Sequence, residues 1–341
     1  ASGLHLVEPT PATFRAASSA GSGELIAAAL DAGATRIVVG LGGSATTDGG
    51  AGLGVALGAR LLDSAGEPVA PGGAALAGVA TVDLSGLDPR LAPAGRPGAA
   101  PGRRSPSGQA DGGPSADEAR RDEGPASADA IGGPTATDAT PWVEVLAATD
   151  VDNPLLGPTG AAAVYGPQKG AGPDDVAPVD AALANYADRV EAALGRELRA
   201  VPGAGAAGGL GFGLLAFCGA RLLPGIEIAL DLVDFDAALA AADLVITGEG
   251  RIDLQTLHGK VVAGVAGRAR AAGVPAYAIG GTVEPTVREE WPRFEAAGLA
   301  GVEATLERPL PLAEALEPAG ARTRLAAAAE RLARALAARR R

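Results

Sequence analysis

Apolar residues recur along the chain with two periods, and each period predicts a set of elements. Helical spacing of leucine, isoleucine, valine and alanine predicts helices at residues 23–32, 51–62, 174–194, 235–242, 260–272 and 312–341. Short apolar or alternating runs predict strands at residues 35–39, 80–84, 142–148, 226–230, 243–247 and 274–280. The uninterrupted runs at residues 35–39 and 243–247 are typical of buried strands. The order strand, turn, helix, strand over residues 243–280 is a βαβ unit, so the pattern predicts an α/β fold with a parallel sheet.

Residues 93 to about 140 interrupt this pattern. They consist mostly of proline, glycine, serine, alanine and aspartate, with hardly a large apolar side chain. A segment of that composition cannot bury enough apolar surface to offset the entropy lost on ordering. We therefore expect a disordered insertion there. The length of 341 residues allows two domains, and we expect one over residues 1–235, which carries the insertion, and one over residues 236–341.

Charge and cysteine content exclude several classes of protein. The formal net charge of −12 disfavours non-specific nucleic-acid binding, which needs a basic surface. Cys218 is the single cysteine, which excludes an internal disulfide and a thiolate-rich metal cluster. No apolar run is long enough to cross a bilayer, and the start of the chain does not resemble a signal peptide. We expect a cytoplasmic protein without nucleic-acid or membrane partners, and homo-oligomerisation stays open.

Three glycine-rich turns that carry carboxylates follow predicted strands. Glycine lets the main chain approach a ligand closely, and oriented N–H groups at such turns attract anions. In doubly wound sheets, ligands bind beyond the carboxyl ends of the strands, so the three turns predict one ligand site. The polar residues of these turns are Ser44 and Asp48 in the first, Asp150, Asp152 and Asn153 in the second, and Glu249, Arg251 and Asp253 in the third.

Each turn also has a purely structural explanation. Asp48 either caps the following helix or takes part in catalysis, where it would bind Mg²⁺. Asp150 and Asp152 either stabilise a turn or bind Mg²⁺ or a hydroxyl-bearing substrate. Lys169, which lies between glycines, is either simply exposed or a phosphate contact. The third turn either forms a surface charge network or belongs to the site. The first turn matches neither GxGxxG nor a Walker A loop, which disfavours dinucleotide binding and P-loop chemistry.

Four motifs together resemble the bacterial glycerate kinase family. They are GLGGSATTDGGAGLGVALGARLLD at residues 40–63, ATDVDNPLLGPTGAAAVYGPQKGAG at 148–172, GAAGGLGFGLLAF at 205–217 and DLVITGEGRIDLQTLHGK at 243–260. The resemblance covers nearly the whole chain outside residues 93–140. It implies two α/β domains, one of them Rossmann-like with a parallel sheet. It also implies ATP-dependent phosphorylation of D-glycerate with Mg²⁺, giving 2-phosphoglycerate in most members.

The start of the chain departs from the family pattern. Family members begin with a strand and a Pro-Asp-Ser-Phe-Lys-Gly-Ser type turn, and then have an Asp-Gly-Gly-Glu-Gly-Thr type turn. Neither occurs in this chain, which begins partway into the pattern. We therefore expect the Rossmann-like domain to be incomplete at its N-terminus. The alternatives are a truncated, inactive relative that binds a small anion, and a kinase of another small hydroxy acid.

Residue chemistry and the resemblance together yield a hypothesis for the site. Phosphoryl transfer needs alignment and charge neutralisation more than covalent chemistry. We expect catalysis to depend on Asp48, Asp150, Asp152 and Lys169, where Asp48 either binds Mg²⁺ or orients the substrate. We expect substrate or phosphate binding by Gly42, Gly43, Ser44, Asn153, Gln168, Glu249, Arg251, Asp253 and Lys260. Within this set, either Asp150 or Asp152 accepts the proton of the attacking hydroxyl.

Overall fold

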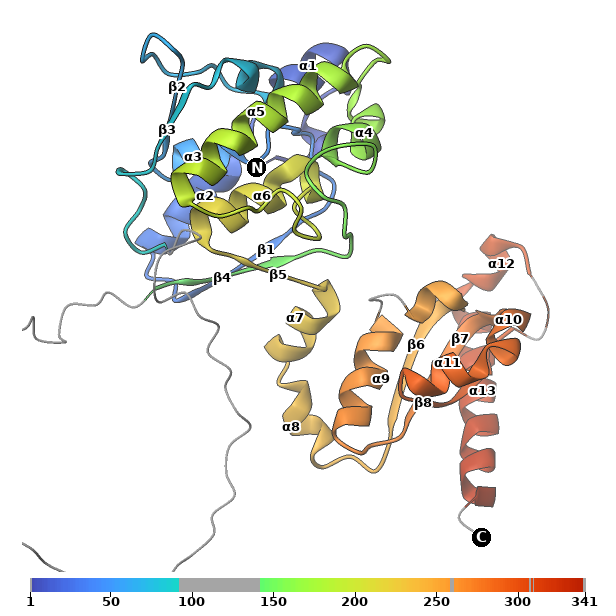
Figure 1. Ribbon diagram of the computed structural model, residues 1–341. Helices are drawn as coiled ribbons and strands as arrows, with labels where there is room; N and C mark the ends of the chain where they lie inside the picture. The colour runs from blue at the N-terminus through green and yellow to red at the C-terminus, as the bar shows by residue number, and fades with distance from the viewer. Residues whose placement is uncertain (1, 92–141, 258–260, 307, 309, 340–341) are drawn as a thin grey trace, which may run out of the picture.

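The computed structural model describes residues 2–91, 142–257, 261–306, 308 and 310–339. The insertion expected at residues 93–140 lies outside these residues. The described elements form two groups, one on each side of residue 224 along the chain, and each group is built on its own parallel sheet (Figure 1).

Three parallel strands form the first sheet. In this sheet β4 (Glu144–Ala148) lies between β1 (Arg36–Gly40) and β5 (Arg221–Leu223). The carboxyl ends of β1 and β4 coincide, because Gly40 pairs with Ala148. The expectation of a buried strand at residues 35–39 is wrong, since β1 alternates between exposed and half-buried positions and Val38 is 40% exposed. Within the described part of the chain, β1 pairs on one side only.

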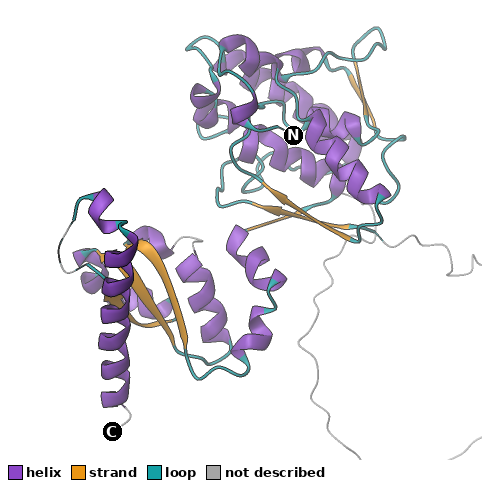
Figure 2. Cartoon of the chain, turned by 180° about the vertical axis from the view of Figure 1, so that it is seen from behind, coloured by secondary structure: helices purple, strands orange, loops and turns teal. Residues whose placement is uncertain are grey.

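Helices pack together over one face of this sheet (Figures 1 and 2). They are α1 (Pro11–Ala16), α2 (Ala20–Asp31), α3 (Ala51–Ala56), α4 (Ala161–Tyr165), α5 (Val176–Leu194) and α6 (Ala206–Cys218). Their core includes Phe14, Tyr186, Phe212 and Phe217, and each of these side chains is fully buried. Glycines stand where α3 meets α6, and because they have no side chain these two helices approach closely. A Cβ on Gly50 of the α3 N-terminus would lie only 2.7 Å from the Cα of Gly213 in α6.

The second sheet is also parallel, in the order β6 (Val245–Ile252), β7 (Ala276–Val283) and β8 (Leu299–Ala304). Its two faces are covered by different helices (Figure 2). One face packs on α9 (Val261–Ala271) and α11 (Trp291–Ala296), and the other on α13 (Pro318–Arg339). The remaining helices are α10 (Pro285–Glu289) and α12 (Leu312–Ala315). The predicted βαβ unit and the α/β fold with parallel sheets are confirmed.

The segment between the two sheets differs from the prediction. Residues 226–230 form part of a helix, α7 (Gly225–Leu232), and not a strand; α8 (Phe235–Leu239) follows it. The five residues 226–230 mix apolar and polar side chains, so their pattern fits a helix as well as a strand. Contacts with distant residues favour the helix. Arg268 of α9 binds Glu227 at 2.8 Å and Asp231 at 2.6 Å, two residues one helical turn apart. The division expected at residue 235 therefore falls between two helices that pack with each other and with α9.

Two further boundaries differ from the prediction. The helix expected over residues 51–62 ends at Ala56, and β2 (Arg60–Leu62) pairs with β3 (Thr81–Asp83) in an antiparallel ribbon. Gly58 makes the break, because its φ of +103° does not suit a helix. The turn expected at residues 248–253 is also wrong. Strand β6 continues through it to Ile252, and its half-exposed pattern shows that it is not fully buried.

Candidate active site

The first two predicted turns lie side by side in the structure. Residues 42–50 follow β1 and residues 150–153 follow β4, and these strands are parallel neighbours with coincident ends. The third cluster belongs to the other sheet. There Glu249 accepts a hydrogen bond from Thr256, and Arg251 lies 3.3 Å from both Asp253 and Glu284. Neither Glu249, Arg251 nor Asp253 has a hydrogen bond or ion pair with a described residue of the first sheet. Lys260 lies outside the described residues.

Lys169 is the most unusual side chain of the first site. It ends a short turn at Pro167–Lys169 and is only 3% exposed, so the alternative of an exposed lysine is wrong. Its Nζ donates to Ser44 Oγ at 3.0 Å and to the carbonyl oxygen of Thr46 at 2.6 Å. Burial lowers the pKa of Lys169 to about 8, against the opposing effect of the Asp48 charge. A cation that loses its proton more readily than an ordinary lysine is thereby held against the glycine-rich turn.

A cavity of about 150 Å³ opens beside this lysine. Its lining consists of Leu41, Gly42, Gly43, Ser44, Val151, Tyr165, Gln168, Lys169 and Ala207. The backbone N–H groups of Gly42, Gly43 and Ser44 donate to no other residue that the structure describes. Free N–H groups next to a lysine ammonium make a candidate anion site, because both carry positive charge. The structure thus brings together Gly42, Gly43, Ser44, Gln168 and Lys169 from the predicted set.

Asp48 lies behind the turn and not in the cavity. It is fully buried, and its Oδ2 accepts hydrogen bonds from Ser19 N and Ser19 Oγ, both at 2.8 Å, and from Gly52 N at 3.2 Å. Its Oδ1 accepts from Gly50 N at 3.2 Å. Burial raises the pKa of Asp48, and the hydrogen bonds from Ser19, Gly52 and Gly50 oppose that rise. The geometry favours the structural alternative for Asp48, since it accepts from Gly50 and Gly52 at the start of α3 and ties them to Ser19 at the start of α2.

The residues do not fit a magnesium ion at Asp48. A ligand to Mg²⁺ must present an oxygen to the ion, and Asp48 is fully buried with both oxygens turned toward N–H or O–H donors. Among the residues that the structure describes, no group of three or more His, Cys, Asp or Glu side chains could hold a metal ion. We therefore assign no step to a metal held by these residues.

The second turn presents two exposed carboxylates and a fixed amide. Asp150 and Asp152 are exposed, and Asp150 Oδ1 accepts a hydrogen bond from Gly225 N at 3.0 Å. Asn153 donates through Nδ2 to the carbonyl oxygen of Thr159 at 2.8 Å and accepts from the Tyr165 hydroxyl at 2.5 Å. Burial, followed by the charge of Asp152, raises the pKa of Tyr165. The amide of Asn153 is therefore oriented on both sides, which a substrate-positioning residue requires.

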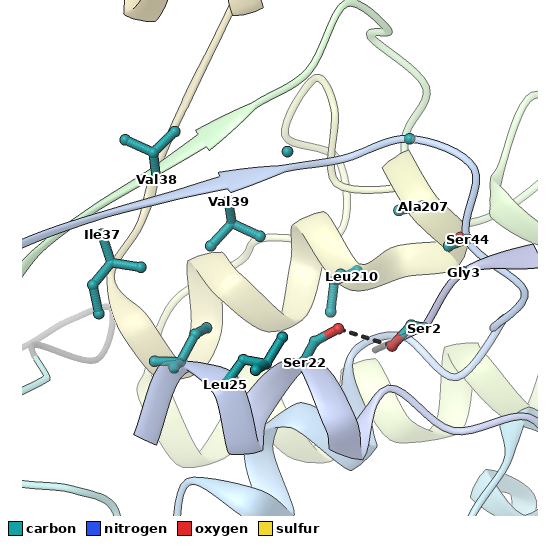
Figure 3. A pocket seen from close by; sticks show the side chains of 13 residues that line it. Ser2, Gly3, Ser22, Leu25, Ile37, Val38, Val39, Ser44, Ala207 and Leu210 are labelled. Carbon is teal, nitrogen blue, oxygen red and sulfur yellow. Dashed lines mark hydrogen bonds between the residues drawn. The ribbon is translucent and has the colours of Figure 1, made fainter. Parts of the chain in front are cut away.

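A larger groove of about 460 Å³ adjoins the small cavity. Figure 3 shows Ile37, Val38 and Val39 of β1 on one side and Ser22 and Leu25 of α2 on the other. The Ser2 hydroxyl lies 2.8 Å from that of Ser22. Gly42, Ser44 and Ala207 line both hollows, so the groove leads to the anion site.

Several residues of the site were not predicted from the sequence. Tyr165 and Ala207 line the cavity, and the Thr46 carbonyl oxygen receives Lys169. Ala207 has a φ of +53°, which is uncommon for a residue with a Cβ, and it begins a left-handed stretch with Gly208 and Gly209. The Gly-Gly pair after Ala207 was the available signal for this bend. The role of the Thr46 carbonyl oxygen could not be predicted, because every residue has a backbone carbonyl and the residue type does not show which one accepts a hydrogen bond.

Comparisons with known proteins agree with this architecture. A family model described as "Glycerate kinase family" matches residues 1–96 and 126–337, which leaves unmatched a stretch inside the expected insertion. Glycerate kinase of Bacillus subtilis (strain 168) is 45% identical over 283 residues, which are 83% of this chain and 61% of that protein. Glycerate 2-kinase of Escherichia coli (strain K12) is 39% identical over 287 residues, 84% of this chain and 62% of that protein. The chain thus spans about three fifths of the length of these relatives.

A solved structure gives the same result for the fold. A crystal structure from Salmonella typhimurium LT2, provisionally named glycerate kinase 2, superposes with a TM-score of 0.70 at 39% identity. The match covers 100% of this chain and 74% of that one. Among the helices that the structure describes, none has the length and apolar character needed to cross a membrane.

Proposed function

The chain belongs to the glycerate kinase family, and from this premise we propose that it phosphorylates D-glycerate with ATP and forms 2-phosphoglycerate. The observation that carries the proposal is the buried Lys169 ammonium beside the free N–H groups of Gly42, Gly43 and Ser44. Such a site neutralises a phosphoryl group during transfer. The name of the Escherichia coli relative, glycerate 2-kinase, supports transfer to the 2-hydroxyl.

The second turn supplies the groups that such a transfer needs next to the anion site. Val151, which lines the cavity, lies between Asp150 and Asp152 in the chain. Either carboxylate accepts the proton of the attacking hydroxyl, and Asn153, held by Tyr165, orients the substrate. Gln168 lines the cavity and adds a polar contact. These roles are part of the proposal.

The third cluster completes the proposal from the other sheet. Arg251 and Lys260 are assigned to the substrate carboxylate or to the outer phosphates, and Glu249 and Asp253 to substrate binding; Asp253, 3.3 Å from Arg251, orients that guanidinium. Support comes from the resemblance of residues 243–260 to the family motif and from the strong pairing of guanidinium groups with carboxylates and phosphates. Magnesium enters the proposal only with the nucleotide. We place the reaction in the cytoplasm.

A coupled assay of ADP release from the full-length protein tests the activity. The assay contains Mg-ATP with D-glycerate, and parallel reactions contain other small hydroxy acids. Turnover with D-glycerate alone supports the proposal, and product NMR then shows which hydroxyl carries the phosphate. No turnover with D-glycerate contradicts it. Asp150→Asn and Asp152→Asn test the base, with Asp174→Asn as the control because Asp174 is an exposed carboxylate outside the cavity lining.

A further inference from the structure

Ser44 and Lys169 have the geometry of a nucleophile and its base. Ser44 Oγ lies 3.0 Å from Lys169 Nζ, which is within the reach required of such a pair. The Thr46 carbonyl oxygen, 2.6 Å from the same Nζ, fixes the direction of the amine, as a third group orients the base in known triads. The two side chains come from segments 125 residues apart, so this contact is made by the fold and not by local sequence.

The amine has the hydrogen-bonding capacity that this role needs. Lys169 is 3% exposed, and burial disfavours its charged form. A neutral amine carries one lone pair and two hydrogens. It can therefore accept the Ser44 hydroxyl proton while it still donates to the Thr46 carbonyl oxygen.

The cavity next to this pair suits the end of a phosphate chain. At about 150 Å³ it is smaller than the ~300–1,000 Å³ typical of pockets that enclose a drug-sized ligand. It is therefore large enough for a terminal phosphoryl group and too small to enclose a whole nucleotide. The N–H groups of Gly42 and Gly43 lie on the same turn as Ser44 and are free to hold the phosphoryl oxygens.

We propose that Ser44 accepts the phosphoryl group from a nucleoside triphosphate and passes it to the final acceptor, with Lys169 as its base. In the first step Ser44 Oγ bonds to the γ-phosphorus and the bond from that phosphorus to the β–γ bridging oxygen breaks. The nucleoside diphosphate leaves, and the Ser44 proton moves to Lys169 Nζ. The ammonium so formed lies next to the new phosphoserine and offsets its charge.

The second step restores the enzyme. The hydroxyl oxygen of the acceptor attacks the phosphoserine phosphorus, and its proton goes to a carboxylate of the second turn, which then releases it to solvent. The Ser44 Oγ–phosphorus bond breaks, and Lys169 returns its proton to Ser44. This inference rests on the proposed function, which supplies the phosphoryl donor and the acceptor.

The experiment measures the covalent intermediate apart from overall turnover. Full-length protein is mixed with γ-labelled ATP without glycerate, quenched, digested and analysed by mass spectrometry, and exchange of labelled ADP into ATP is followed in parallel. We expect phosphoserine at position 44, exchange without glycerate, and loss of the label when D-glycerate is added. Ser44→Ala abolishes both signals, and Lys169→Met slows labelling about 10²–10⁴-fold. Ser85→Ala, an exposed serine after β3, behaves as the wild type.

The outcomes separate this inference from the proposed function. If D-glycerate drives ADP release but the wild type forms no phosphoserine and shows no exchange, the inference is wrong and the proposed function stands. Label that persists in Ser44→Ala also overturns the inference. If the wild type gives neither ADP release nor label, both are wrong. The wild-type measurement decides the question even if Ser44→Ala fails to fold.

Discussion

Lys169 Nζ lies 3.0 Å from Ser44 Oγ and joins the turn after α4 to the loop after β1. Lys169 is one of only two lysines in the chain, the other being Lys260. In a chain so depleted of lysine, one of the two is buried against a glycine-rich turn whose N–H groups are free. This relationship is the basis for the anion site and for the predictions that follow.

The low lysine content makes the ionisation of Lys169 directly measurable. Protein labelled with carbon-13 at the lysine Cε should show two signals, and one of them should titrate with a pKa of about 8. Inorganic phosphate should raise that pKa, because a nearby anion favours the charged amine. Lys169→Met assigns the signal. A titration near the ordinary value of 10.5 for both lysines would contradict the burial of Lys169.

The same ionisation makes stability depend on pH in a defined direction. The folded pKa of Lys169, about 8, lies below the ordinary 10.5, so between these values the unfolded chain holds more protons. The free energy of unfolding contributed by this group therefore rises with pH across that window, by on the order of 3 kcal/mol. Urea unfolding at several pH values checks this as the difference between wild type and Lys169→Met. If the free energy of unfolding changed with pH in the same way in the wild type and in Lys169→Met, the prediction would be wrong.

Asp48 should behave as a structural cap. In Asp48→Asn one acceptor oxygen becomes an NH₂ group that faces N–H donors of Ser19, Gly50 or Gly52. We expect a loss of about 2 kcal/mol in the free energy of unfolding, because buried donors lose their acceptor. Denaturant unfolding measures this, with Asp174→Asn as the unaffected control. Unchanged stability together with weaker magnesium binding in Asp48→Asn would instead support a metal ligand.

Gly208 should tolerate no side chain, since its backbone passes beside the Lys169 contact. Its φ is +73°, and a Cβ there would lie 1.8 Å from the Thr46 carbonyl oxygen and 2.8 Å from Lys169 Nζ. Gly195 is the matched control, because its φ of +65° is equally left-handed but a Cβ there meets nothing within 4 Å. We expect Gly195→Ala to cost about 1 kcal/mol and Gly208→Ala about 2 kcal/mol more. Equal losses of stability in the two variants would show that the close approach of Gly208 to the Thr46 carbonyl oxygen does not restrict the side chain at position 208.

Sequence patterns predicted a long amphipathic helix and a βαβ unit with parallel strands. Helix α5 and the βαβ unit of β6, α9 and β7 lie where the spacing of apolar residues places them. Short segments were ambiguous, and α7 shows why. Its five predicted strand residues form a helix that buries Ile228 and Leu230 and whose Glu227 and Asp231 pair with Arg268, more than thirty residues later. No local pattern contains that information.

The candidate site was predictable where side-chain chemistry and loop position coincide. Ser44, Gln168 and Lys169 could be named from their glycine-rich surroundings, and the structure brings them to one cavity. The role of Asp48 could not be decided, because a capping and a catalytic aspartate look alike until the donors of Ser19 and Gly52 are seen. Tyr165 gave no signal, since a tyrosine in an alanine-rich helix usually belongs to the core.

The most direct test of the central claim compares Lys169→Met with the wild type in D-glycerate-dependent ADP release. The claim is that Lys169 and the turn of Gly42, Gly43 and Ser44 form the phosphoryl site. We predict that the wild type turns over and that Lys169→Met, still folded by circular dichroism, loses about 10²–10³-fold in kcat. Asp174→Asn keeps the wild-type rate. A folded Lys169→Met protein with the wild-type kcat would contradict the account.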